Sequence, residues 1–298
     1  MIDLHLHTKH SDGADSVERL LTNAESLNLE IISITDHDTV GAYKEIERNQ
    51  ELLNLYSGEI IPGTELKAIY NGINIEVLAY GIDYNKLVIR EVDVDKIQKE
   101  NLEYFKELAK KYDFTIDNSI YIDSSIPEKR WGSGVFSREL LKYPENIYKL
   151  KKLNEPDFFE VDFYRKGESN KNSIFYIDTS KYYPDINQII EDVHNAGGLT
   201  FLAHAYIYPF DNVEKEVENI LLNTEIDGIE CKHSLLNEEQ RMTLETLCKK
   251  YNKYMSGGSD YHGNIKTGVK MKTGINNNLS ISKEFIEEWY NKIKFKIK

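Results

Sequence analysis

The chain has little cysteine and no long apolar run, and each shortage excludes a class of protein. Its two cysteines, Cys231 and Cys248, form no C-x-x-C pair, which argues against structural zinc and favours a reducing, cytoplasmic location. No segment approaches the roughly 18 consecutive apolar residues that cross a bilayer. The first residues also lack the basic and then apolar pattern of a secretory leader. We therefore expect a protein that is neither inserted in a membrane nor exported.

Basic residues are also in short supply. The 37 Lys and Arg residues face 50 Asp and Glu, for a formal net charge of −13, which argues against an extended surface for duplex DNA. A small phosphorylated ligand held by metal ions remains compatible with this charge. With 298 residues, 40% of them hydrophobic, the chain can bury a substantial core, so a disordered protein is excluded.

Two histidines stand close together near the N-terminus. Residues 2–7 read Ile-Asp-Leu-His-Leu-His, which alternates as a strand does, so His5 and His7 share one face. Asp12 follows just beyond them. Two imidazoles on one face of a strand are typical of a metal site.

Strands and helices alternate along the first part of the chain. A helix is expected to begin at Asp15, as an N-cap with Glu18 at the third position, and a second helix is expected over residues 42–56. Strands are expected over residues 31–35, 59–61 and 74–80. Repeated units of strand, helix and strand predict an α/β fold with a parallel sheet.

The alternation stops after Asp83 and resumes near Tyr183. A helix is expected over residues 92–112, and the rest of this interval has no strand rhythm. We expect residues 85–182 to form an inserted, mainly helical cap. Residues 1–84 and 183–298 would then form one discontinuous domain.

Polar residues of one chemical kind recur where the predicted strands end. The strand over residues 199–203 ends in His204, and the strand over residues 227–231 precedes His233. Parallel barrels keep their active sites at the carboxyl ends of their strands. The candidate metal ligands are His5, His7, Asp12, His37, Glu65, Glu76, His204, Asp260 and His262.

This set offers nitrogen and oxygen ligands and no thiolate, which suits Mn²⁺, Fe²⁺ or Zn²⁺ and differs from a structural zinc site. Several ions can share such a set. A carboxylate such as Glu65 can bridge two metals, and two metals about 3.5–4 Å apart can hold a hydroxide and clamp a transferring phosphoryl group. The expected chemistry is hydrolysis of a phosphate ester.

Local motifs carry a family resemblance. They are His5-Leu6-His7-Thr8 with Ser11-Asp12-Gly13, Ile34-Thr35-Asp36-His37-Asp38, Gly63-Thr64-Glu65, Ala196-Gly197-Gly198 before Leu202-Ala203-His204, and Gly257-Gly258-Ser259-Asp260-Tyr261-His262-Gly263. Together they resemble the PHP (polymerase and histidinol phosphatase) family, in the branch that holds nucleoside 3′,5′-bisphosphate phosphatases and a 5′-to-3′ exoribonuclease. The resemblance implies a distorted (β/α)7 barrel that binds up to three divalent metal ions.

The resemblance also implies which residues share each ion. His5, His7, Glu65 and Asp260 would hold one metal, and Asp12, His37 and His262 a second. Glu65 would bridge to a third ion, with His204 and the residue at Glu76. Relatives usually carry histidine there, so Glu76 either favours Mn²⁺ or Fe²⁺ over Zn²⁺ or leaves the third site weak or empty.

The insert departs from the family pattern. Relatives carry an Arg-Pro-His-x-Ala-Arg run that faces the substrate phosphate, and here residues 133–138 read Ser-Gly-Val-Phe-Ser-Arg. Only Arg138 matches. Arg130, or Lys129 beside it, could supply a compensating phosphate contact.

Catalytic roles follow for four residues. His37 and Asp260 would belong to the catalytic metal set, and Asp260 or Asp36 would orient the nucleophile or its proton. Asp36 could equally hold a ligating histidine in place. His233 would contact phosphate or donate a proton to the leaving oxygen. His10 and His194 are expected to lie outside the ligand set.

The expected substrate is a small, nucleotide-like phosphate ester. The first alternative is a 5′-to-3′ exoribonuclease on short RNA, and the second is a degenerate, non-catalytic metal-binding module that serves a partner protein. A histidinol-phosphate phosphatase is a minor alternative. The sequence leaves the oligomeric state open.

Overall fold

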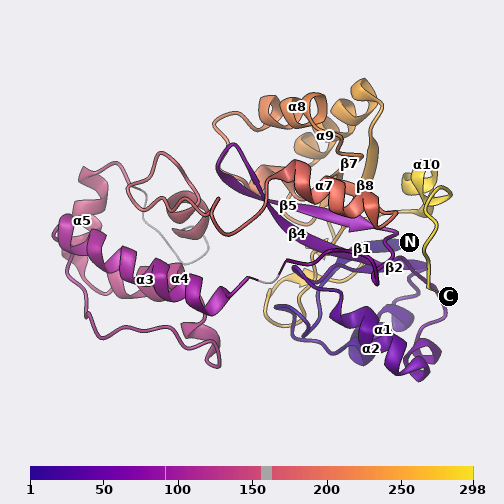
Figure 1. Ribbon diagram of the computed structural model, residues 1–298, viewed down its shortest axis with the longest axis horizontal. Coiled ribbons are helices and arrows are strands. Elements are labelled where there is room, and N and C mark those ends of the chain that lie inside the picture. The colour runs from indigo at the N-terminus through magenta and orange to yellow at the C-terminus, as the bar shows by residue number, and fades with distance from the viewer. Residues whose placement is uncertain (91, 156–162, 298) are drawn as a thin grey trace.

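Three short parallel strands open the chain. The computed structural model describes residues 1–90, 92–155 and 163–297. Within it, β1 (Ile2–Leu6), β2 (Ile31–Ile34) and β3 (Glu59–Ile60) pair in the order β1-β2-β3. The helices α1 (Val17–Ser26) and α2 (Gly41–Arg48) cover one face of this sheet, as Figure 1 shows below β1 and β2. Leu20, Leu21 and Ile46 pack there against Ile32.

Two helix boundaries differ from the prediction. The N-cap of α1 is Ser16, whose hydroxyl accepts from the Arg19 amide, and not Asp15. The Asp15 carboxylate is engaged elsewhere, because it accepts from the hydroxyl of Tyr261 at 2.8 Å. The second helix ends at Arg48, and the chain continues as a 3-10 helix (η1, Gln50–Leu55).

The second sheet holds five strands in the order β4-β5-β6-β7-β8. They are β4 (Gly63–Tyr70), β5 (Ile73–Tyr80), β6 (Leu199–Leu202), β7 (Gly228–His233) and β8 (Tyr254–Gly258). The prediction of an all-parallel sheet is wrong here, because β4 with β5 and β5 with β6 are antiparallel. Asn71-Gly72, with φ of 50° and 72°, makes the tight turn that reverses the chain between β4 and β5. From β6 to β8 the strands are parallel.

Helices α7 (Ile186–Asn195), α8 (Val213–Asn223) and α9 (Glu238–Tyr251) cover the outer face of this second sheet (Figure 1). The core beneath them includes the thiols of Cys231 and Cys248, which are free and have their sulfurs 3.6 Å apart. A separate apolar cluster lies between the two sheets, where Ile2 and Leu4 of β1 meet Phe201 and Trp289. The sheets therefore share an interior and are clad by helices on their outer faces.

Short elements complete this part of the molecule. They are η4 (Ala205–Ile207), the antiparallel pair β9 (Val269–Lys270) and β10 (Gly274–Ile275), η5 (Lys283–Ile286) and α10 (Glu287–Tyr290).

A helical lobe lies apart from both sheets, at the left of Figure 1. It contains α3 (Val94–Lys111), η2 (Pro127–Lys129), α4 (Gly132–Leu140), α5 (Pro144–Lys152) and the π-helix η3 (Phe163–Glu168). The helix predicted over residues 92–112 is thus observed as α3. The lobe has its own core, in which the rings of Phe105, Phe136, Phe163 and Phe175 contact one another.

Isolated bridges connect the two sheets. Leu6 of β1 bridges to Tyr261 beyond β8, and His37 beyond β2 bridges to Glu65 of β4. These two contacts define a seam between the sheets. In the part of the chain that is described, the strands form these two sheets and the small β9–β10 pair, and not one closed ladder. No helix in that part is both long and apolar enough to cross a membrane.

Candidate metal centre

The seam brings the two N-terminal histidines to the middle of a cluster of polar side chains. β1 is buried along its whole length, and its alternation directs His5 and His7 to the same side, with ring centroids 5.1 Å apart. Both side chains are fully buried. A pair of buried imidazoles needs polar partners, and these come from other strand ends.

Glu65 is the central carboxylate of the cluster. Its Oε2 lies 3.1 Å from His5 Nε2, 3.4 Å from His7 Nε2 and 3.3 Å from His37 Nδ1. Its Oε1 lies 2.8 Å from Nε2 of His204. Burial alone would raise the pKa of Glu65, but the neighbouring histidines, with His5 and His37 foremost, hold that pKa well below its usual value.

A second group surrounds Asp12. His262 Nε2 lies 3.2 Å from Asp12 Oδ1, His7 Nδ1 lies 3.6 Å from the same oxygen, and His37 Nε2 lies 3.7 Å from Oδ2. Burial opposes ionisation of Asp12, and the facing His37 and His262 outweigh it, so the pKa of this carboxyl is lowered. His7 faces both groups and joins them.

Asp260 faces both His5 and His7 from the opposite edge of the seam. Its Oδ1 lies 3.4 Å from His7 Nε2 and 3.6 Å from His5 Nε2. Its Oδ2 accepts from the Lys266 ammonium and from His233 Nε2, the latter at 3.2 Å. Its φ of 58° is uncommon for a residue with a side chain and directs the carboxylate toward the cluster.

Glu76 lies at the edge of the cluster. Its Oε1 is 3.5 Å from His37 Nδ1, and its Oε2 is 3.5 Å from His204 Nε2. Burial and the charge of Glu65 raise the pKa of Glu76 to about 8. Eight of the nine sequence-predicted ligands therefore fall in four groups that could each hold an ion, one of which also takes in His233: His7, Asp12, His37, His262; His5, His7, Glu65; His5, His233, Asp260; and His37, Glu65, Glu76. The ninth, His204, lies beside them, with Nε2 2.8 Å from Glu65.

Outer hydrogen bonds fix which nitrogen of two histidines is free. His5 Nδ1 lies 2.8 Å from Glu230 Oε1, so it carries the proton and leaves Nε2 to face Glu65. His262 Nδ1 lies 2.9 Å from the backbone carbonyl of Asp260, which leaves its Nε2 to face Asp12. Both histidines are therefore prepared to offer Nε2 to a cation.

His233 is set differently. Its Nδ1 accepts from the Leu235 amide at 3.2 Å, so Nε2 carries the proton and donates to Asp260. His233 also lies within reach of one cation together with His5 and Asp260, but its Nε2 could bind that cation only after losing this proton.

The donor set fits a cation. Among the described residues, several buried imidazole nitrogens have no hydrogen-bond partner, namely His7 Nδ1 and Nε2, His37 Nδ1 and His204 Nδ1. Leaving such atoms unpaired costs about 1–3 kcal/mol each. Divalent cations would satisfy imidazole nitrogens of this kind and neutralise the carboxylates beside them.

Asp36 lies outside this cluster. Its Oδ1 accepts from the Thr8 amide at 2.7 Å and from the Ser11 hydroxyl at 2.6 Å, and its Oδ2 accepts from the Thr8 hydroxyl at 2.6 Å. Both oxygens hold the loop that follows His7. That placement matches the alternative in which Asp36 positions a ligating histidine.

The basic residues predicted for substrate lie in the helical lobe. Arg138 donates to the backbone carbonyl of Glu128, and Lys129 places its ammonium 3.7 Å from the centroid of the Tyr121 ring. Arg130 stands between η2 and α4. His10 pairs with Glu45 and His194 with Asp227, away from the cluster, as expected.

Sequence reasoning missed Glu230 and Lys67. Glu230 holds His5, and its other oxygen accepts from the His204 amide at 2.9 Å. Lys67 lies two residues after Glu65 on β4, directly opposite Glu76 on β5. The available signals were an acid within the buried strand Gly228–His233 and the period-two spacing of residues 65 and 67.

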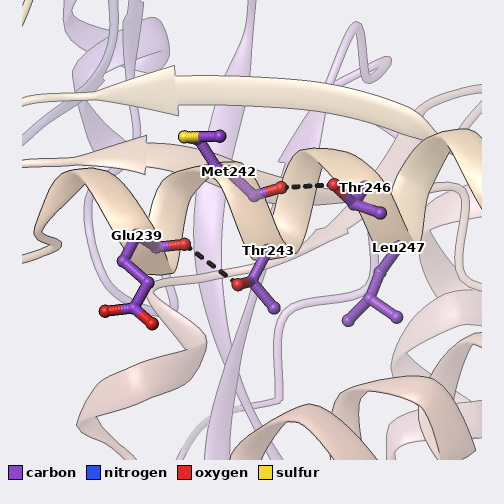
Figure 2. Close-up of a pocket in the computed structure, with 5 residues that line it drawn as sticks. All are labelled: Glu239, Met242, Thr243, Thr246 and Leu247. Carbon is purple, nitrogen blue, oxygen red and sulfur yellow. Dashed lines mark hydrogen bonds between the residues drawn. The ribbon is translucent and has the colours of Figure 1, made fainter.

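A hollow of about 490 Å³ lies along α9, and its lining shares no residue with the histidine cluster. Figure 2 shows the side chains that line it, which are Glu239, Met242, Thr243, Thr246 and Leu247. The hydroxyls of Thr243 and Thr246 bond back to their own helix, to the carbonyls of Glu239 and Met242. Its lining offers one carboxylate and no imidazole, so it lacks the donor set of the histidine cluster.

Comparisons with known proteins place this geometry in context. The family model described as PHP domain matches residues 3–294. The chain is 24% identical over 265 residues to the 5′-3′ exoribonuclease Rnm of Escherichia coli, covering 87% of this chain and 84% of that one. It is 21% identical over 269 residues to a phosphoribosyl 1,2-cyclic phosphate 1,2-diphosphodiesterase of Eggerthella lenta, covering 88% and 94%.

A solved structure has the same fold. It is a protein of Bifidobacterium adolescentis assigned as a metal-dependent phosphoesterase, with a TM-score of 0.61 and 22% identity. The match covers 96% of this chain and 94% of that one.

Proposed function

Because the chain belongs to the PHP domain family, we propose that it is a metal-dependent phosphoesterase that hydrolyses a phosphate ester of a small, nucleotide-like substrate. The observation that carries this proposal is the buried cluster of nine imidazole and carboxylate ligands around Glu65. The ligand set lacks thiolates and is much larger than the four ligands of a structural zinc site. Such a set suits hydrolysis at phosphorus by two or three ions.

The ligands divide into three groups. His5, His7, Glu65 and Asp260 would hold one ion, and Asp12, His37 and His262 a second. A third would use Glu65, His204 and Glu76, where the extra carboxylate favours Mn²⁺ or Fe²⁺ over Zn²⁺. When bound, the ions supply Lewis-acid stabilisation of the phosphoryl group and lower the pKa of water.

Three residues of the chain would donate a proton or position other groups at the site. His233 carries its proton on Nε2, against Asp260, so it can donate to the leaving oxygen or to a phosphate oxygen. Asp260 accepts from both His233 and Lys266, which keeps this carboxylate ionised and in position. Asp36 acts as a positioning residue for the loop after His7.

In this proposal, the two sheets are the two parts of the wall of a distorted (β/α)7 barrel. Residues 85–182 would form a cap that is inserted into the barrel sequence. The support is the shared apolar interior between the sheets, with helices on both outer faces. The lobe's separate core supports the division into domains. Arg130 and Arg138 would reach substrate from this cap.

A second candidate is 5′-to-3′ digestion of short RNA. It is favoured by the similarity to an exoribonuclease over most of both chains. The same ligands would serve it, since each step hydrolyses a phosphate ester. Neither candidate needs duplex DNA.

The test is phosphate or nucleotide release by Mn²⁺-loaded protein from a panel of adenosine 3′,5′-bisphosphate, adenosine 5′-monophosphate, histidinol phosphate and a short 5′-phosphorylated RNA. We expect His37→Ala and Asp260→Ala each to lower turnover by about a hundredfold or more, since each removes several kcal/mol of charge stabilisation. His194→Ala is the matched control, a histidine outside the cluster that should leave turnover near wild type. Equal turnover by His37→Ala and His194→Ala would defeat the site assignment.

A further inference from the structure

The C-terminal segment carries a dense group of basic residues on an acidic chain. Residues 292–298 read Lys-Ile-Lys-Phe-Lys-Ile-Lys, with four lysines and no acid, whereas the whole chain has a formal net charge of −13. Strict alternation of this kind is typical of an extended segment with one face packed and the other face exposed. The structure describes this segment as far as residue 297.

The apolar members of the segment face the molecule. Ile297 exchanges two backbone hydrogen bonds with Ile60 of β3, at 3.0 Å and 2.8 Å, so the segment continues that sheet by one antiparallel bridge. Ile293 is buried in the space left by Gly81, where a Cβ would come within 2.6 Å of it. Phe295, between the two isoleucines, is half-buried. These contacts fix the segment in place and leave its lysines on the other face.

Lys292, Lys294 and Lys296 therefore form a row on the outer face, and all three side chains are exposed. Alternate residues of an extended chain are separated by about 6.5–7 Å, so the three positive charges follow one line. Among the ion pairs of residues 1–90, 92–155 and 163–297, none includes a member of this lysine row. The row is thus a line of cations that no carboxylate of the described residues neutralises.

Aromatic rings hold two of these ammonium groups. Lys292 donates to the hydroxyl of Tyr254 at 2.6 Å, and the Lys296 ammonium lies 3.5 Å from the centroid of the Tyr290 ring. The ammonium of Lys283 lies 4.5 Å from the same ring, so two cations share one tyrosine. Partial burial lowers the pKa of Lys296, and the charge of Lys283 lowers it further. Rings hold such charges without neutralising them, and a bound anion would relieve the repulsion between them.

The lysine row lies at the other end of the strands from the metal cluster. Tyr254, which contacts Lys292, is the first residue of β8, and the candidate ligand Asp260 lies beyond the last. Five residues of strand span about 17 Å. Figure 1 also shows the C-terminus and the helical lobe on opposite sides of the sheets. A phosphate held by the row is therefore not the phosphate that the ions would cleave.

The occupant of such a row is long and anionic, which describes an RNA strand or an anionic membrane. Peripheral membrane contact also uses apolar side chains that enter the bilayer, and here Ile293, Phe295 and Ile297 face inward. Single-stranded RNA is followed by a line of cations with aromatic rings beside it. The chemistry of the segment therefore favours RNA.

We propose that the lysine row binds the backbone of single-stranded RNA, on the 3′ side of the nucleotide at the metal centre. A long RNA would then contact the protein at two separate places, and a very short one only at the metal centre. The contribution to turnover rests on the second candidate of the proposed function, whereas the binding does not.

The competing explanation is protection of an open sheet edge. Lysines on an edge strand commonly prevent pairing with another chain, and the C-terminal segment lies at the edge beside β3. In that case removal of the lysines would promote self-association and leave RNA binding unaltered.

The experiment removes the row in one variant, Lys292→Gln with Lys294→Gln and Lys296→Gln. Fluorescence anisotropy measures binding of the Mn²⁺-loaded full-length protein to labelled oligoadenylates of about 20 nucleotides and of three nucleotides, with phosphorothioate linkages that resist hydrolysis, at about 50–200 mM KCl. We expect the variant to bind the long strand at least tenfold more weakly at the lowest salt. The slope of log K against log[salt] should become shallower by about 2, since each lost contact to a single strand removes about 0.7. Binding of the trinucleotide should not change.

Two matched variants serve as controls. Arginine at the same three positions keeps the charge and should bind the long strand as wild type does. The combination of Lys215→Gln, Lys249→Gln and Lys250→Gln removes the same net charge from exposed positions on α8 and α9. It should keep the wild-type affinity and slope.

A turnover arm uses the same strands with ordinary phosphate linkages. We expect the ratio of kcat/KM for the long strand to kcat/KM for the trinucleotide to fall at least tenfold in the glutamine variant of the row and to stay at the wild-type value in both controls.

The outcomes separate the explanations. If the glutamine variant binds the long strand as the α8 and α9 control does, the RNA contact is wrong and the proposed function stands. Larger particles in light scattering with unaltered RNA binding would assign the row to edge protection. Lost sedimentation with phosphatidylserine vesicles, with unaltered RNA binding, would assign it to a membrane surface. If RNA binding depends on the row but nothing on the substrate panel is hydrolysed, the RNA contact stands and the proposed function fails.

Discussion

At the scale of single residues, Glu230 supports the metal cluster without being one of its candidate ligands. One of its oxygens fixes the tautomer of His5, and the other holds the His204 backbone. Carboxylates in this role typically improve metal affinity 10–100-fold. We expect Glu230→Gln to weaken Mn²⁺ binding by about that factor, measured by competition with a chelator.

The control for this change is Glu239→Gln, an acid on the exposed face of α9. It alters net charge by the same amount and should leave metal affinity unchanged. If both variants bind Mn²⁺ as wild type does, Glu230 does not position a ligand.

Protonation of two ligands makes metal binding depend on pH. Burial would lower the pKa of His7, but the carboxylates of Asp260 and Glu65 outweigh it and raise this pKa to about 9. The pKa of Glu76 is raised to about 8. At pH 7 the metal-free protein therefore holds a proton on each group, and an ion must displace them.

We expect Mn²⁺ binding at pH 7 to release protons and to strengthen as the pH rises from 7 toward 9. The measurement is calorimetry in buffers of different ionisation enthalpy. Glu76→Gln should release fewer protons than wild type, since it removes one of the groups that hold a proton at pH 7. Binding heats that are the same in every buffer would contradict this assignment.

At the scale of elements, α9 supports β7 through its start. Asn237 and Gln240 form a reciprocal capping box, with both hydrogen bonds at 2.9 Å, and Arg241 in the first turn donates to the backbone carbonyl of His233. We expect Asn237→Ala to lower the free energy of unfolding by about 1 kcal/mol in urea denaturation. Asn219→Ala, in the interior of α8, should stay within about 0.5 kcal/mol of wild type. Equal losses in both would mean that the cap contributes nothing.

The secondary-structure elements also explain which site residues could be predicted from the sequence. The nine candidate ligands could be selected from the sequence because each lies in a local motif, as His5 does in β1 and His7 does just after it. β4 was hidden because Pro62-Gly63 reads as a turn, which left Glu65 outside a strand. Glu230 was missed because its partners His5 and His204 lie on strands that are distant from it in sequence. Lys67 was missed because its position opposite Glu76 depends on the register of the β4–β5 hairpin.

Asp36 illustrates the same limit of local patterns. Its place beside His37 left two roles open, orienting the nucleophile or holding a ligating histidine, and its partners Thr8 and Ser11 come from the loop after β1. A side chain next to a ligand in sequence can therefore point away from it. The antiparallel direction of β5 was likewise decided by a two-residue turn and not by the strand pattern.

At the scale of the whole molecule, the helical lobe and the sheets have separate cores. Phe136 is fully buried in the lobe, and Phe201 is fully buried between the sheets. Each Phe→Ala change should cost about 3–5 kcal/mol. We expect Phe136→Ala to speed hydrogen exchange in α3 and α4 while β1 and β8 stay protected, and Phe201→Ala to do the opposite. Exchange that rises uniformly in both variants would mean that the two parts unfold as one.

The seam between the sheets has a consequence for how the molecule holds its shape. Leu6 stands between His5 and His7, Tyr261 stands between Asp260 and His262, and the other bridge joins His37 to Glu65. Candidate ligands therefore lie at or beside both bridges that connect the two sheets. Ions bound there would act as cross-links between segments far apart in sequence, in the way disulfides do in secreted proteins. In this phosphoesterase, the same bound ions would then serve both hydrolysis and the stability of the fold.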